Sequence, residues 1–164
     1  MARLMQMTTA IFNETGMSEI YTIDSGVGRG RANRRDDVML VQLLLKKADA
    51  ISISAGLPGL HESNLKVDGI CGPTTLKFIE GFGFTGTLTR GLGQMNVAND
   101  DGFDPLPANR SVKSSNGLWY KIFAVNVRAK QNMESRTPNY NSLIDDPQTP
   151  PLLRAALMGN RRID

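Results

Sequence analysis

Hydrophobic residues recur at helical spacing between about residue 36 and residue 50. The apolar stripe consists of Val38, Val41, Leu45 and Ala48. Further leucines widen this surface, which predicts a helix buried on more than one side. Asp36 and Asp37 open the segment, where carboxylates favour the positive end of a helix, and Asn33 offers another capping oxygen. We therefore expect a strong helix here.

A second helical pattern begins at Pro73 and runs to about residue 82. A proline suits the first turn of a helix, because its missing N–H would have no partner there. Gly81 and Gly83 favour the end of the helix at this point. The residues that point into a core are Leu76, Phe78, Ile79 and Phe82.

Three other segments carry weaker patterns. Residues 20–23 are typical of a short strand that ends at a turn. Residues 117–131 place several apolar side chains on one helical face, although their partial alternation would also suit a strand. Residues 152–158 follow two prolines and predict a short helix.

The composition is that of an ordinary globular protein. The chain has 164 residues, of which 40% are hydrophobic and 21% are charged. Sixteen glycines and eight prolines lie mostly between the apolar segments, which indicates short elements joined by many loops. No segment approaches the ~20 apolar residues that span a bilayer, so we expect no membrane span.

The net charge of +3 is less informative than its distribution. Four arginines cluster before the first strong helix: Arg29, Arg31, Arg34 and Arg35. Nucleic-acid binding needs a denser basic stripe, often with stacking aromatics, so we expect no nucleic-acid partner. The arginines either keep a loop solvated or bind an acidic ligand such as a carboxylate-bearing peptide.

Catalytic and cofactor motifs do not emerge. His61 is the single histidine, which excludes zinc sites built from two or three histidines within this chain. Cys71 lies beside a Gly-Pro helix start and is interpreted as a small packed residue rather than a nucleophile. The glycines of residues 26–31 lack the spacing of a phosphate-binding loop, and the acids of residues 100–105 lack that of a calcium loop. We expect no enzyme activity, no cofactor and no metal.

Two motifs together resemble the type 1 peptidoglycan-binding domain. The first is the helix pattern Asp37-Val38 … Val41-Gln42 … Leu44-Leu45. The second is the turn and helix Val67-Asp68-Gly69-Ile70 … Gly72-Pro73 … Thr75 … Ile79 … Phe82. Cys71 stands where such domains commonly carry an aromatic residue, and Gly83 stands where they carry glutamine.

This resemblance covers residues 26–84 and implies a mainly α fold, with a small three-helix peptidoglycan-binding-like bundle. Its implied core is Val38, Val41, Leu45, Ile70, Ile79 and Phe82. Residues 1–25 would be an N-terminal segment, and residues 85–164 a loop-rich helical extension. We expect that extension to dock on the same chain, because Leu118, Trp119 and Ile122 are too apolar to remain in water.

The resemblance further implies non-catalytic binding of peptidoglycan or its stem peptide, which would anchor a partner or particle at the wall. The candidate ligand-binding residues are Arg29, Asn33, Arg34, Arg35, Asp68 and Thr74. An alternative is an adaptor in a phage-like or contractile secretion apparatus, with Trp119 and Tyr120 as the candidate partner surface. The N-terminus lacks an apolar stretch of signal-peptide length, so we expect synthesis in the cytoplasm and export, if any, without a cleaved leader.

Overall fold

The structure is a computed structural model that describes residues 1–54, 65–85, 97, 101–108, 111–134 and 143–159. These residues form five helices and four short strands. In chain order they are β1 (Arg3–Gln6), α1 (Thr9–Thr15), β2 (Glu19–Thr22), β3 (Val27–Gly28), α2 (Arg35–Ser54), α3 (Pro73–Thr85), β4 (Gly102–Phe103), α4 (Lys121–Glu134) and α5 (Pro151–Gly159). No described helix is both long and apolar enough to cross a membrane.

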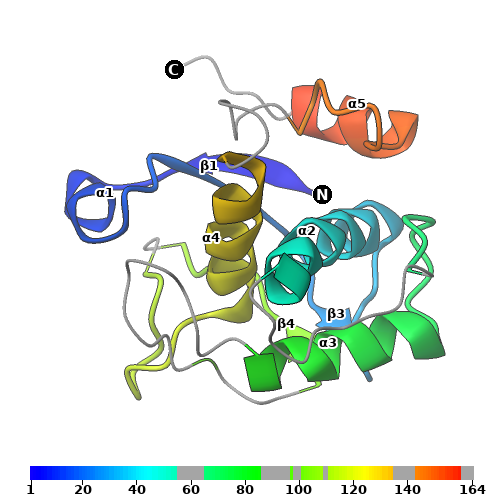
Figure 1. Ribbon diagram of the computed structural model, residues 1–164, viewed down its shortest axis with the longest axis horizontal. Coiled ribbons are helices and arrows are strands. Elements are labelled where there is room, and N and C mark those ends of the chain that lie inside the picture. The colour runs from blue at the N-terminus through cyan, green and yellow to red at the C-terminus, as the bar shows by residue number, and fades with distance from the viewer. Residues whose placement is uncertain (55–64, 86–96, 98–100, 109–110, 135–142, 160–164) are drawn as a thin grey trace.

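Helix α2 lies at the centre of the fold, and α4 runs across it (Figure 1). Helices α3 and α5 also contact α2. Every residue from Asp37 to Leu45 is buried, which agrees with a helix covered on several sides. The helix extends four residues beyond the expected end near residue 50.

The first 25 residues form a small antiparallel sheet with a helical connection. Strand β1 pairs with β2, with Arg3 opposite Thr22. Thr8 caps α1 by accepting a hydrogen bond from the Ile11 N–H, and Gly16 ends the helix at a φ of 70°. The strand expected at residues 20–23 is confirmed with a shift of one residue, whereas β1 and α1 were not predicted.

Helix α4 confirms a helix in the region 117–131, but it begins four residues later than expected. The strand alternative is wrong, because residues 121–129 are helical and buried on all sides. Asn126 of α4 completes the hydrogen bonding of β2. Its Oδ1 accepts from the Tyr21 N–H at 2.8 Å, and its Nδ2 donates to the Tyr21 carbonyl at 2.7 Å.

The glycine-rich segment pairs with a distant part of the chain. Strand β3 is antiparallel to β4, with Gly28 opposite Gly102. Gly28 has a φ of 141°, and a Cβ there would lie 2.2 Å from the Asp101 carbonyl oxygen. Glycine is therefore required for this close approach of two backbones. The acids of this region face arginines, since Asp101 pairs with Arg29 and Asp104 pairs with Arg31.

One hydrophobic core joins all parts of the chain, from Ala2 in the N-terminal segment to Leu157 in α5. The described part of residues 26–84 contains two helices, α2 and α3, and α4 from the predicted extension packs on α2. The chain is thus partly helical with two small sheets. Ile70 was expected in the core and is instead 66% exposed.

Candidate functional site

The turn between residues 68 and 75 is held in place by Gln42 of α2. Its Nε2 lies within 3.1 Å of three oxygens: Asp68 Oδ1, the Ile70 carbonyl and Thr75 Oγ1. Its Oε1 accepts from the backbone N–H groups of Asp68 and Gly69. The Gln42 side chain is buried, so these bonds replace water that it would otherwise need. One glutamine thereby connects the two motifs that carry the family resemblance.

Gly69 brings this turn against the start of α2. Its φ is 78°, which favours glycine, and a Cβ there would lie 2.8 Å from the Arg35 carbonyl oxygen and 2.4 Å from Arg35 Cγ. The aliphatic part of Arg35 therefore lies directly on the turn. Ile70 is the next residue, and its side chain is exposed, while the backbone of the turn is hydrogen-bonded to Gln42.

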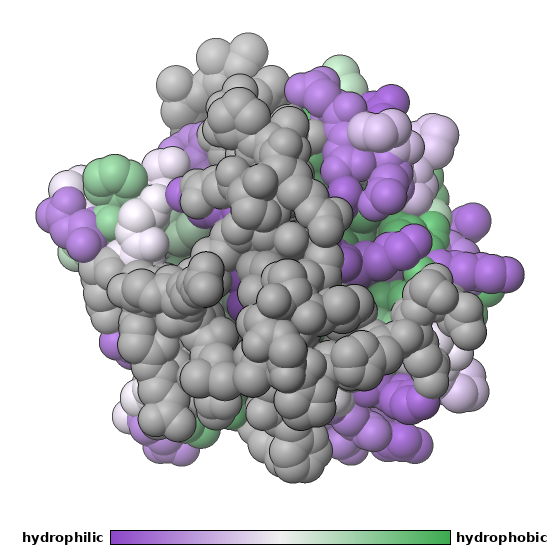
Figure 2. Space-filling view, in the orientation of Figure 1, coloured by the Kyte–Doolittle hydropathy of each residue, from purple (hydrophilic) through white to green (hydrophobic). Residues whose placement is uncertain are grey.

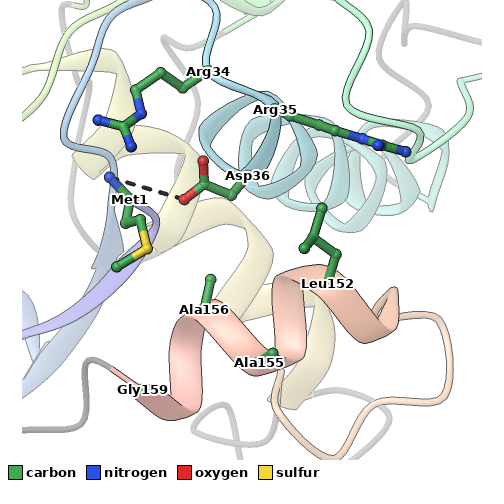
Figure 3. Close-up of a pocket in the computed structure, with 8 residues that line it drawn as sticks. All are labelled: Met1, Arg34, Arg35, Asp36, Leu152, Ala155, Ala156 and Gly159. Carbon is green, nitrogen blue, oxygen red and sulfur yellow. Dashed lines mark ion pairs between the residues drawn. The ribbon is translucent and has the colours of Figure 1, made fainter.

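A pocket of about 450 Å³ opens between the start of α2, the N-terminal segment and α5 (Figure 3). It is lined by Met1, Arg34, Arg35, Asp36, Leu152, Ala155, Ala156 and Gly159. The four α5 residues recur at spacings of three and four, so they form one face of that helix. On the view of Figure 2, hydrophobic surface is exposed between α5 and α2, and hydrophilic side chains border it.

Helix α5 is anchored so that this face remains open. Leu153 and Leu157 are fully buried and attach the opposite side of the helix to the core. The Arg154 guanidinium of α5 donates to the carbonyl of Asp146, which lies in the segment before the helix, at 3.0 Å. Lys47 of α2 pairs with the Asp146 carboxylate and so fixes the entry to α5.

Arg34 and Arg35 flank the pocket with exposed side chains. Neither guanidinium forms a hydrogen bond or ion pair with another residue in the described part of the chain. In Figure 3 the two side chains diverge: Arg34 extends toward Met1, and Arg35 extends away from it along α2. Both cations are therefore available to a ligand.

Asp36 is the one acidic side chain that lines this pocket, and it is already engaged. Its Oδ2 accepts from the Ala2 N–H at 3.0 Å and lies 3.9 Å from the Met1 ammonium (Figure 3). The Met1 ammonium lies closest to Asp24, at 2.8 Å, so it offsets the Asp36 charge only in part, and the two arginines supply the further positive charge at the pocket.

The other candidate residues from the sequence have structural partners or lie elsewhere. Arg29 lies 3.6 Å from Glu80 and 3.8 Å from Asp101. The Asn33 side chain bonds the N–H and carbonyl of Gly28, so it shapes the turn before α2 instead of capping the helix. Asp68 belongs to the Gln42-bound turn. Thr74 is exposed in the first turn of α3 and does not line the pocket.

Trp119 and Tyr120, the candidate partner surface, pack against the core instead of forming a free patch. The Trp119 ring stacks on Phe123, with centroids 5.2 Å apart, and the Lys113 ammonium lies 4.2 Å from its centroid. Both residues are half-buried. The aromatic pair is therefore part of the packing of α4.

Titratable groups near the site show two opposite effects. The Ile70 N–H bonds the Asp68 carboxylate and lowers its pKa. Burial raises the pKa of the Asp37 carboxyl, which accepts hydrogen bonds from the backbone of Asp24 and Ser25. Burial also raises the pKa of the Cys71 thiol, which disfavours the reactive thiolate.

His61 lies outside the described residues. Within the described ranges, no three His, Cys, Asp or Glu side chains come together in a way that could hold a metal ion. Sequence reasoning missed the contribution of α5 to the pocket. The small residues at positions 155, 156 and 159 would have indicated an open helix face, but not which element lies opposite it.

No protein-family model matches the chain, and neither a curated protein nor a solved structure matches it significantly.

Proposed function

We propose that this chain is a non-catalytic module that binds peptidoglycan through the pocket at the start of α2 and anchors a partner at the wall. The single observation that carries the proposal is the pair of Arg34 and Arg35, which flank a mostly apolar pocket and have no ionic partner among the described residues. Stem peptides of peptidoglycan carry carboxylates, and an arginine binds a carboxylate through two parallel hydrogen bonds.

The arrangement of the two motifs also supports the proposal. In this interpretation α2, α3 and α4 are the three helices of a peptidoglycan-binding-like unit, and Gln42 joins the first helix to the Asp68–Thr75 turn. Gly69 then places Arg35 on that turn. The family motif and the candidate pocket are therefore adjacent.

Co-sedimentation with purified sacculi tests the proposal. The double variant Arg34→Ala/Arg35→Ala should lose about tenfold or more in binding, since charge-assisted hydrogen bonds each contribute ~1.5–3 kcal/mol. Its thermal stability should change only slightly, because neither guanidinium has an ionic partner among the described residues and only the aliphatic contact of Arg35 with Gly69 is lost.

A matched control separates specific recognition from loss of positive charge. Lys46→Ala/Lys77→Ala also removes two positive charges, but from exposed residues that do not line the pocket. That control should sediment with sacculi as the parent does. If both double variants lose sacculus binding equally, the loss is explained by net charge, and the proposed site is overturned.

A second candidate function, a protein–protein adaptor, is favoured by a different observation. Leu152 and Met158 of α5 are 48% and 59% exposed, and such apolar groups are typical of contact surfaces when they are contiguous. A partner in a phage-like or contractile secretion assembly would cover this helix. Absence of sacculus binding in the parent protein would favour the adaptor.

A further inference from the structure

The two pocket arginines cannot serve the same carboxylate in the arrangement that the structure shows. Arg34 immediately precedes α2 and Arg35 is its first residue, so only Arg35 has a direction set by the helix. Figure 3 shows their guanidinium groups at opposite sides of the pocket, with Asp36 between them on the first turn of α2. Arg35 is further constrained because its Cγ lies on Gly69 of the turn.

The surface between the arginines suits small apolar groups. Leu152, Ala155 and Ala156 of α5 contribute methyl and methylene groups, and Gly159 contributes no side chain at all. A pocket of about 450 Å³ falls in the range that holds ligands of a few residues. A ligand that fills it must therefore present an apolar middle to α5.

We infer that the pocket selects a short peptide with two separated carboxylates, one paired with Arg34 and the other with Arg35, and small apolar residues between them. The inference deepens the proposed peptidoglycan binding and rests on it, because the diacidic peptide would be part of a stem peptide. The Asp36 carboxylate accepts the Ala2 N–H and lies near the Met1 ammonium, so the two ligand carboxylates would pair with the arginines on either side of it.

Binding of defined peptides to the full chain tests the inference. The probe is N-acetyl-Glu-Ala-Ala, whose Glu side chain and terminal carboxylate are separated by small residues over a chain of ~10 Å. Two monoacids complete the set: N-acetyl-Gln-Ala-Ala, and the Glu peptide with a C-terminal amide. Affinities are measured by NMR titration for the parent, Arg34→Ala, Arg35→Ala and the control Lys46→Ala.

The parent and the control should bind the diacid about tenfold more tightly than either monoacid. Each arginine variant should lose about that factor toward the diacid. Each arginine variant should also bind one of the two monoacids as tightly as it binds the diacid, because the carboxylate missing from that monoacid no longer has a partner. That monoacid should differ between Arg34→Ala and Arg35→Ala. Unchanged amide spectra away from the pocket would establish that both variants remain folded.

Two results overturn the inference without touching the proposed function. One is that both arginine variants become indifferent to the same carboxylate, which means that the guanidiniums converge on one group. The other is that the parent binds sacculi but discriminates by less than twofold between the diacid and the monoacids. The reverse pattern, selective binding of the diacid without binding to sacculi, supports the pocket's specificity and refutes the peptidoglycan proposal.

Discussion

Gln42 and Asp68 exchange two hydrogen bonds, although 26 residues separate them in the chain. The Gln42 amide donates to the Asp68 carboxylate at 3.0 Å, and the Asp68 N–H donates to the Gln42 carbonyl oxygen at 3.1 Å. This reciprocal pair attaches the turn before α3 to the middle of α2. Because Gly69 of the same turn contacts Arg35, the pair also positions one side of the candidate pocket.

Replacing Gln42 with leucine should destabilise the protein strongly. The substitution leaves the N–H groups of Asp68 and Gly69 without the Gln42 acceptor, whereas the Thr75 hydroxyl keeps its bond to the Ile70 carbonyl. With ~1–3 kcal/mol for each unsatisfied buried donor, we expect a loss of about 2–4 kcal/mol in the free energy of unfolding. Urea denaturation measures this loss.

The variant Gln42→Glu separates the acceptor from the donor role of this side chain. A carboxylate still accepts from the two N–H groups, but it faces the Asp68 carboxylate and cannot donate to it. We expect a loss at neutral pH that becomes smaller on acidification, as one of the two acids takes up a proton. A Gln42→Leu protein as stable as the parent would show that the turn does not depend on this residue.

Asp68 should contribute a pH dependence to stability. The Ile70 N–H lowers its pKa in the folded chain below the ordinary value of 3.8. The unfolded chain therefore takes up the proton first as the pH falls. The Asp68 contribution to stability is fully present above about pH 5 and is lost as the pH falls through 3.8 toward the folded pKa.

Asp68→Asn provides the comparison, because its Oδ1 accepts the same hydrogen bonds but does not titrate. Relative to that variant, the parent should lose stability between pH 5 and pH 3 in urea denaturation. Asp145→Asn, which removes an exposed carboxylate outside the turn, should retain the acid dependence of the parent. If the parent and Asp68→Asn respond alike to acid, the bond from Ile70 does not stabilise the ionised carboxylate.

Local patterns were sufficient to predict the helices other than α1. Helices α2, α3 and α5 follow from apolar spacing, together with acidic residues in the first turn of α2 and prolines at the start of α3 and α5. These signals lie within a few residues of each helix. Strand β1 and helix α1 were missed because four and seven residues are too short to show a period. The sequence does contain a capping residue, Thr8, and a terminating glycine, Gly16, at the ends of α1. These signals alone do not predict a helix when no helical repeat of apolar residues lies between them.

Partners distant in sequence could not be predicted. Asn33, Asp36 and Asp37 were interpreted as caps of α2, but their side chains bind the backbone of Gly28, Ala2 and Asp24. The same limit applies to the site. The arginine cluster indicated an acidic ligand, but the sequence does not reveal that Arg29 meets acids from α3 and from the segment before β4. Nor does it reveal that α5 forms the pocket floor beside Arg34 and Arg35.

Asn126 should be essential for joining the N-terminal segment to α4. Its amide bonds both the N–H and the carbonyl of Tyr21, and all of these groups are buried. Asn126→Leu would remove both of these bonds to buried backbone groups, at ~1–3 kcal/mol each, so we expect a loss of about 3–5 kcal/mol. Denaturation measures the total, and hydrogen exchange at the Tyr21 amide measures the local effect.

Two further variants test whether the loss arises from the Asn126 hydrogen bonds. Asn116→Leu makes the same replacement at an exposed turn and should change stability little. Asn126→Asp keeps the acceptor for the Tyr21 N–H, but it sets a buried carboxylate against the Tyr21 carbonyl, so it should also be strongly destabilised. If Asn126→Leu instead retains the stability of the parent and slow exchange at Tyr21, then the Asn126 bonds do not attach this segment. The burial of Ile20 and Tyr21 in the core shared with α4, together with the pairing of β2 with β1, would then be sufficient to hold β2 in place.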